Sequence, residues 1–253
     1  MQNFKFTIEY DGTNFNGWQI QEKSQRTVQG EIQKVLEKIF KKKIHVHGSG
    51  RTDRGVHALG QVAHCQIETN KSTSEILFAV NANLPPDISI VKVEAVAHSF
   101  NAQYSALSKT YRYTILNRRV RQPLSRFFMY QYPYRLDIAG MKKAGRYLRG
   151  KNDFKAFTSL ESARIQEGKA RRTIRTVSKL RIKKSGPMIM IEIKADGFLY
   201  KMVRNIIGAL LEVGSGRMKA SEMKEILEKK DRAHAGKAAP PWGLCLLKVD
   251  YPK

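Results

Sequence analysis

Stretches with the two-residue period of β-strands alternate with stretches of helical period along this chain, and their order limits its possible folds. Residues 4–10 alternate apolar and polar side chains, which predicts a half-buried strand. After Thr27, a residue type that caps helices, apolar residues recur at helical spacing as far as Phe40. We expect further strands at about 44–46, 62–67, 88–96, 111–115, 173–182, 188–195 and 244–251, and further helices at 74–83, from Asp137 to Gly150, at 198–213 and after Ser221.

This order does not have the regular β-α-β-α alternation of a parallel doubly wound sheet. It predicts an α+β protein of two ferredoxin-like, or RRM-like, halves with antiparallel sheets. We expect the halves to cover residues 1–104 and 105–253. With 253 residues, 42% of them hydrophobic, the chain can bury a substantial core. The residues show no clear internal repeat.

The charge balance points to a polyanionic partner. Lys and Arg number 46 against 22 Asp and Glu, a formal net charge of +24. Such an excess favours nucleic acid, because neutralising phosphates releases counterions. A membrane is the competing anionic surface, but the sequence has no long apolar run and no basic amphipathic helix with a bulky aromatic face. We therefore expect a soluble, cytoplasmic protein.

The sequence does not predict a metal or cofactor site. Its two cysteines are too few for a disulfide framework or a zinc cluster. Four histidines lie between residues 45 and 64, but no Cys/His pairs stand at zinc-ligand spacing. Residues 48–50 lack the Gly-Lys-Ser/Thr ending of a phosphate-binding loop.

Residues 48–58, GSGRTDRGVHA, place one carboxylate, Asp53, between Arg51 and Arg54 in a glycine-rich loop. Glycine permits positive φ angles and close approach to a ligand. A carboxylate that neighbouring guanidinium groups keep ionised can act as a nucleophile or stabilise a cationic sugar carbon. The residue types alone are more typical of a surface turn with a local ion pair.

Five segments together carry a resemblance to a known family. The string at 48–58 resembles the catalytic loop of the TruA-type tRNA pseudouridine synthases, and YDGTNFNGWQ at 10–19 resembles their N-terminal signature. KTYRY at 109–113 is similar to the strand that supplies their active-site tyrosine, and FLYKMVRNIIG at 198–208 to their C-terminal helix motif. APPWGL at 239–244 stands in the place of their closing Ala-Pro…Gly-Leu stretch, although its tryptophan is less typical.

The resemblance implies an isomerase that converts uridine to pseudouridine at positions 38–40 of the tRNA anticodon stem-loop. It also implies that the antiparallel sheets of the two halves flank a basic catalytic cleft. It implies that Asp53 is the catalytic aspartate, that Tyr111 stacks on the uracil, and that Arg204 pairs with Asp53. Arg51 and Arg54 are candidates to clamp phosphate. The family acts as a homodimer, and the reaction involves no oxidation or phosphoryl transfer, so no cofactor is expected.

A basic loop at 168–172 holds Lys169, Arg171 and Arg172 and fits either a solvated face or an RNA-backbone contact. The main rival function is a non-catalytic RNA-binding protein on the same scaffold, associated with tRNA or the ribosome. A methyltransferase is a weaker rival, because the turn after the first strand is too short and polar for a glycine-rich cofactor loop.

Overall fold

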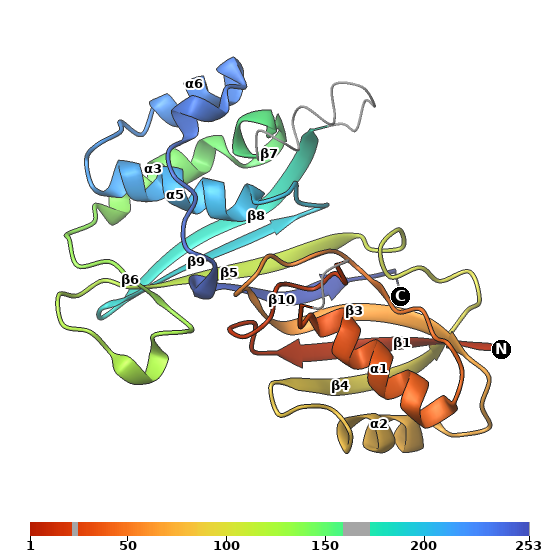
Figure 1. Cartoon of the computed structure of the whole chain (residues 1–253). Coiled ribbons are helices and arrows are strands. Elements are labelled where there is room, and N and C mark those ends of the chain that lie inside the picture. The colour runs from red at the N-terminus through yellow and green to blue at the C-terminus, as the bar shows by residue number, and fades with distance from the viewer. Residues whose placement is uncertain (22–24, 159–172, 253) are drawn as a thin grey trace. The chain divides into compact units, whose positions relative to one another are not determined.

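The computed structural model describes residues 1–21, 25–158 and 173–252 (Figure 1). The chain forms two compact units, Met1–Leu107 together with Cys245–Lys253, and Ser108–Leu244. We call them the N-terminal unit and the central unit. Both combine helices with mostly antiparallel strands, so the α+β prediction is confirmed.

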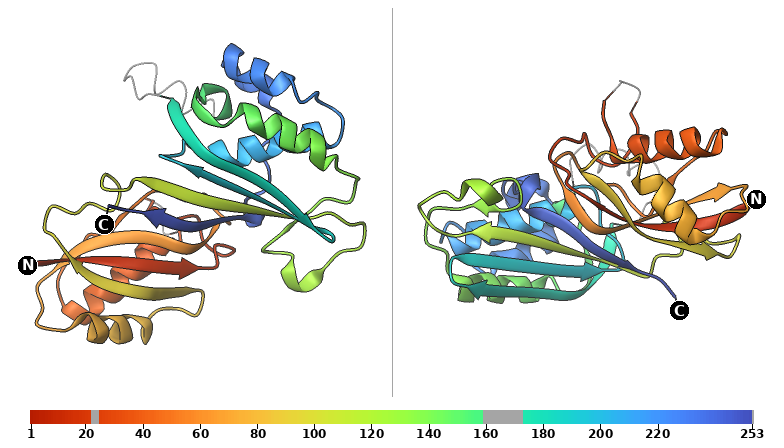
Figure 2. Two further views of the ribbon diagram at one scale, coloured as in Figure 1. Left: turned by 180° about the vertical axis from the view of Figure 1, so that it is seen from behind. Right: turned by 90° about the horizontal axis from the view of Figure 1, so that it is seen from below.

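In its described residues, the N-terminal unit has a sheet of order β4-β1-β3-β10 and two α-helices. β1 (Gln2–Tyr10) pairs antiparallel with β3 (His57–Ile67) and with β4 (Ile88–Val96), so that Phe4 lies opposite Cys65 and Ala95. The helices α1 (Val28–Phe40) and α2 (Thr73–Asn81) pack against each other on one side of this sheet (Figure 2). The Thr27 side chain accepts the Gly30 N–H at 3.2 Å, which confirms the predicted cap of α1.

The last strand distinguishes the observed units from the predicted halves. β10 (Leu244–Asp250) lies parallel to β3, with Cys245 opposite His57. The Tyr251 hydroxyl donates to the Ala102 carbonyl at 2.7 Å, and the Leu107 N–H donates to the Asp250 carbonyl at 2.8 Å. Residues 245–253 therefore group with the N-terminal unit, whereas the sequence predicted one continuous half over 105–253.

The predicted strand at 44–46 is wrong. In that region only His47–Gly48 (β2) pairs, with β3. Side chains of α1 occupy the backbone groups that a longer ladder would use: Glu37 Oε1 accepts the Ile44 N–H at 3.3 Å, and Gln29 Nε2 donates to the Val46 carbonyl at 2.8 Å.

The described residues of the central unit form the strands β5 (Ser108–Leu116), β6 (Tyr130–Gln131), β7 (Gly150–Asp153), β8 (Ile174–Ser185) and β9 (Met188–Ala195), and the α-helices α3 (Ile138–Tyr147), α5 (Met202–Gly214) and α6 (Glu222–Lys229). The sheet has the order β5-β9-β8-β7, and β6 adds to β5 in parallel. The helix α3 packs against α5 and β8, and α6 packs against α3. The predicted helix at 198–213 starts later, at Met202, because Lys201 adopts the left-handed conformation (φ 59°).

Candidate active site

The loop that carries Asp53 connects β2 to β3 in the N-terminal unit. Asp53 is half-buried, and its carbonyl accepts the Val56 N–H at 3.1 Å in a tight turn. Gly55 takes a positive φ of 77° in this turn, a conformation that suits glycine. Arg51 and Arg54 are both exposed, so the loop presents one carboxylate between two solvent-accessible guanidinium groups.

The residue that precedes Asp53 is held by the segment at the end of β1. The Trp18 N–H donates to the Thr52 carbonyl at 3.1 Å. The hydroxyls of Tyr10 and Thr52 lie 2.8 Å apart, and both side chains are buried. Burial raises the pKa of the Tyr10 phenol, so this hydroxyl keeps its proton and its hydrogen bond with Thr52.

Two glycines let this segment approach the loop backbone to backbone. A Cβ on Gly12 would lie 2.0 Å from the Val56 carbonyl oxygen. A Cβ on Gly17, whose φ is +86°, would lie 2.5 Å from the Thr52 carbonyl oxygen. Since real Cβ atoms do not approach so closely, only glycine fits at either position without moving the Asp53 loop.

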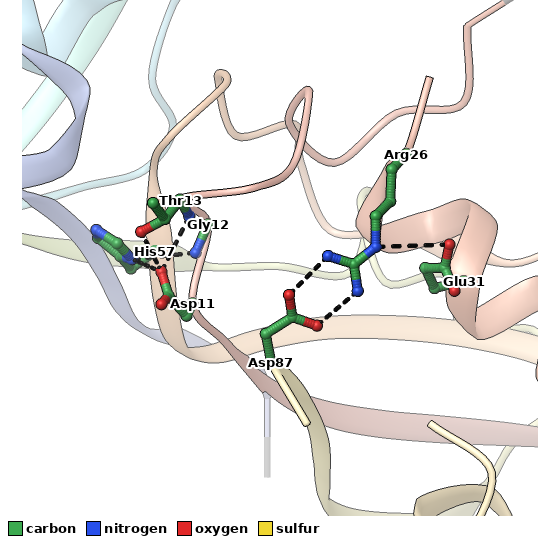
Figure 3. A network of polar contacts seen from close by, with 7 residues as sticks. All are labelled: Asp11, Gly12, Thr13, Arg26, Glu31, His57 and Asp87. Atoms are coloured by element: carbon green, nitrogen blue, oxygen red, sulfur yellow. Dashed lines mark hydrogen bonds and ion pairs between the residues drawn. The ribbon is translucent and has the colours of Figure 1, made fainter. Parts of the chain in front are cut away.

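Polar contacts hold the connection between β1 and α1 near both of its ends, at Asp11–Thr13 and at Arg26 (Figure 3). The Gly12 N–H donates to Nδ1 of buried His57 at 3.0 Å, and Asp11 Oδ1 lies 3.1 Å from that nitrogen. Further along, Arg26 donates to both carboxylate oxygens of Asp87 at 2.7 Å. The same guanidinium lies 4.2 Å from the centre of the Phe15 ring, a cation–π arrangement.

The start of the loop is anchored from β3. Gln61 accepts the Ser49 hydroxyl at 2.8 Å and donates to the Gly50 carbonyl at 3.0 Å. Because Gln61 is fully buried, these bonds are shielded from water. Hydrogen bonds are stronger in the protein interior than in water, since the local dielectric constant is lower. The Asp53 loop is therefore a preorganised element, braced on both sides.

Tyr111 and Arg204 belong to the central unit. Tyr111 lies on β5 and is 8% exposed. Its ring makes an edge-to-face contact with the ring of Phe198, with ring centres 5.1 Å apart and planes at 90°. Arg204 lies in the first turn of α5; its Nε donates to the Ala239 carbonyl at 2.8 Å, and the Ala239 N–H donates back to the Arg204 carbonyl at 2.9 Å. These bonds set the orientation of the guanidinium.

Asp53 thus lies in one unit and Tyr111 and Arg204 in the other, and their meeting in a single site stays a prediction. Lys169, Arg171 and Arg172 lie outside the described residues. Sequence reasoning missed Tyr10, His57 and Gln61 as supports of the loop. Their spacing in the sequence reveals no partner, since each acts through a contact that forms only in the folded unit: Tyr10 with Thr52, His57 with Gly12, and Gln61 with Ser49 and Gly50.

The described residues hold no group of three His, Cys, Asp or Glu side chains placed to bind a metal ion. Among the histidines, His64 accepts the Ala102 N–H at 3.1 Å and stacks on His47 with ring centres 5.2 Å apart. Burial lowers the pKa of His64, and the neighbouring His47 adds to this effect. In the part of the chain that is described, no helix has the length and apolar character needed to cross a membrane.

Comparison with known proteins decides the family. A family model described as tRNA pseudouridine synthase matches residues 7–105 and 144–252. The chain belongs to this family. Its members are isomerases that act on uridine in tRNA, and the TruA-type resemblance of the sequence motifs is confirmed.

Relatives match over almost the whole chain. A "tRNA pseudouridine synthase A" of Thermoanaerobacter sp. (strain X514) is 45% identical over 251 residues, which cover 99% of this chain and 100% of the relative. Proteins of Caldicellulosiruptor bescii ("tRNA pseudouridine synthase A") and Clostridium perfringens ("tRNA pseudouridine synthase A 2") are each 43% identical over the same shares.

Proposed function

We propose that this enzyme isomerises uridine to pseudouridine at positions 38–40 of the tRNA anticodon stem-loop, without a cofactor. The observation that carries the proposal is the full-length family match together with an Asp53 loop that is held rigidly. Single-stranded and loop nucleotides are those whose bases can be splayed out for recognition, which suits an anticodon arm.

In the proposed reaction the bond between C1′ and N1 of the uridine breaks, the uracil rotates, and a bond forms between C5 and C1′. N1 gains a proton and C5 loses one, so the product is an isomer of the substrate. Asp53 supplies the carboxylate that adds to the sugar or the base. Tyr111 stacks on the uracil and assists the proton transfer, and Arg204 pairs with Asp53 and orients its carboxylate.

The basic residues take the role of holding the RNA. Arg51 and Arg54 are exposed beside Asp53, where each guanidinium can bind a phosphate through two hydrogen bonds. We propose that Lys169, Arg171 and Arg172 also contact the RNA backbone. Two ferredoxin-like halves would flank a basic cleft, and two copies of the chain would cradle one tRNA in the cytoplasm.

Tritium release tests the reaction class directly. Purified protein mixed with tRNA that is tritiated at uracil C5 should release tritium to water with no added nucleotide, methyl donor or metal, and chelator should not slow it. Pseudouridine mapped to positions 38–40 should match the released counts. Tight binding without tritium release from several unmodified tRNAs would favour the non-catalytic RNA-binding alternative, which the family match disfavours.

Substitution of Asp53 tests its role. Asp53→Asn keeps the side-chain shape but removes the charge, so turnover should fall below about one percent of wild type while tRNA affinity stays within a few-fold. Asp231→Asn, at an exposed carboxylate of the central unit, is the matched control and should retain full activity. Loss of tRNA binding along with turnover would instead assign Asp53 a structural role.

A further inference from the structure

A preformed pocket lies in the central unit beyond the end of β5, the strand that carries Tyr111. Its volume is about 590 Å³, and it opens to solvent. Six residues from two chain segments line it: Asn117, Arg118, Arg119, Pro133, Tyr134 and Arg135. Three of the six are arginines and none is acidic.

Side-chain bonds to the backbone brace both segments. Asn117 Nδ2 donates to the carbonyls of Tyr132 (2.9 Å) and Tyr134 (2.7 Å), which ties the two walls together. Gln131 Nε2 donates to the Arg119 carbonyl at 2.9 Å. The pocket therefore does not have to form when a ligand arrives, which reduces the entropy lost on binding.

The arginines suit an oxyanion that carries several acceptor oxygens. Arg119 and Arg135 are exposed, while Arg118 is half-buried and donates to the carbonyls of Val120 (2.9 Å) and Arg121 (3.2 Å). A planar guanidinium binds a phosphate through two parallel hydrogen bonds. Clustering of such groups in one concave place favours a phosphodiester over a single carboxylate.

An exposed aromatic ring completes the pocket. Tyr134 is 70% exposed, and its ring meets Tyr132 with centres 5.8 Å apart. Tyr132 in turn contacts Tyr130 at 6.1 Å, and Tyr130 contacts Trp242 at 6.4 Å. This row of aromatic rings supports Tyr134 from one side and leaves most of its surface open to solvent, as a base-stacking platform requires.

We propose that this pocket binds a backbone phosphate of the tRNA substrate, with the neighbouring nucleobase stacked on Tyr134. The proposal rests on the proposed function for the identity of the RNA. Asn117 follows Tyr111 by six residue steps along β5 and its end, about 20 Å at the rise of a β-strand. The bound nucleotide is therefore several positions away from the reacting uridine, and the pocket contributes affinity and register rather than chemistry.

The first test removes the charge of the pocket. Arg119→Gln combined with Arg135→Gln should raise the Kd and KM for tRNA about ten-fold and leave kcat unchanged. The slope of the logarithm of the binding constant against the logarithm of the salt concentration should also become less steep, by about 0.7 to 0.9 for each phosphate that the protein no longer neutralises. The matched control, Arg146→Gln with Arg149→Gln, removes two exposed arginines of the same unit and should change both quantities much less.

The second test separates stacking from charge. Tyr134→Ala should weaken tRNA binding about five-fold or more, whereas Tyr134→Phe keeps the ring and should bind within two-fold of wild type. Equal effects of the pocket and control arginine pairs, or equal binding by the Ala and Phe variants, would overturn the proposal. The Kd and its salt dependence are measured without turnover, so they are independent of tritium release, and failure of the pocket and failure of the catalytic assignment are separate outcomes.

Discussion

The close approach of Gly17 to the Asp53 loop makes a specific prediction about catalysis. In Gly17→Ala the new methyl group would lie 2.5 Å from the Thr52 carbonyl oxygen and 3.2 Å from the Arg54 nitrogen. These two atoms flank Asp53 in the sequence. Relief of the clash requires a loop displacement of about 0.5 Å or more, and a misplacement of about 1 Å can lower a rate by roughly 10²-fold.

Gly150→Ala is the matched control. Gly150 has nearly the same φ as Gly17, 89° against 86°, but a Cβ at Gly150 would meet nothing within 4 Å. Both variants should lose about 1–2 kcal/mol of stability from the left-handed backbone, which lowers the melting temperature by roughly 2–8 °C. Only Gly17→Ala should also displace the loop.

The assay is the rate of tritium release from C5-labelled tRNA at saturating enzyme, with tRNA affinity measured separately. We expect Gly17→Ala to be about 10- to 100-fold slower than Gly150→Ala and to bind tRNA within a few-fold of it. If the two folded variants turn over at the same rate, the close approach of Gly17 to Thr52 does not position Asp53, and the loop is not preorganised by this contact.

Three further predictions concern other parts of the molecule. If the hydroxyl of Tyr111 takes part in proton transfer, Tyr111→Phe should slow tritium release nearly as much as Tyr111→Leu; a wild-type rate for the Phe variant would leave only stacking. Burial, with a smaller effect of the charge on Arg175, lowers the pKa of Lys109 to about 8, so the charged form opposes folding. The stability of wild type relative to Lys109→Met should therefore rise by up to about 3 kcal/mol as the pH rises from 8 to 10.5; a pH-independent difference in denaturant unfolding would contradict it. Removal of Lys169, Arg171 and Arg172 together should flatten the salt dependence of tRNA binding and leave the choice of uridine unchanged, as checked by binding titrations and pseudouridine mapping.

The sequence by itself determined the elements whose evidence is local. The alternation along β1 and the helical period after Thr27 predicted both elements correctly, and the predicted strands at 88–96 and 188–195 coincide with β4 and β9. Local periodicity is informative because burial of one face forces it on any strand or helix. The Asp53 loop could also be recognised, since its glycines and charges are contiguous in the chain.

Only the tertiary structure decided what depends on residues far apart in the sequence. β10 joins the N-terminal unit because its backbone bonds with β3, a pairing that no local pattern specifies. Tyr10 followed the apolar period of its strand, and its hydroxyl gained a role only when β1 placed it 2.8 Å from Thr52. The arginine pocket likewise exists because Asn117 ties two segments together. The residue type determines which interactions a side chain can make. Its actual partners depend on how the unit packs, because buried polar groups must find hydrogen-bond partners among residues distant in the sequence.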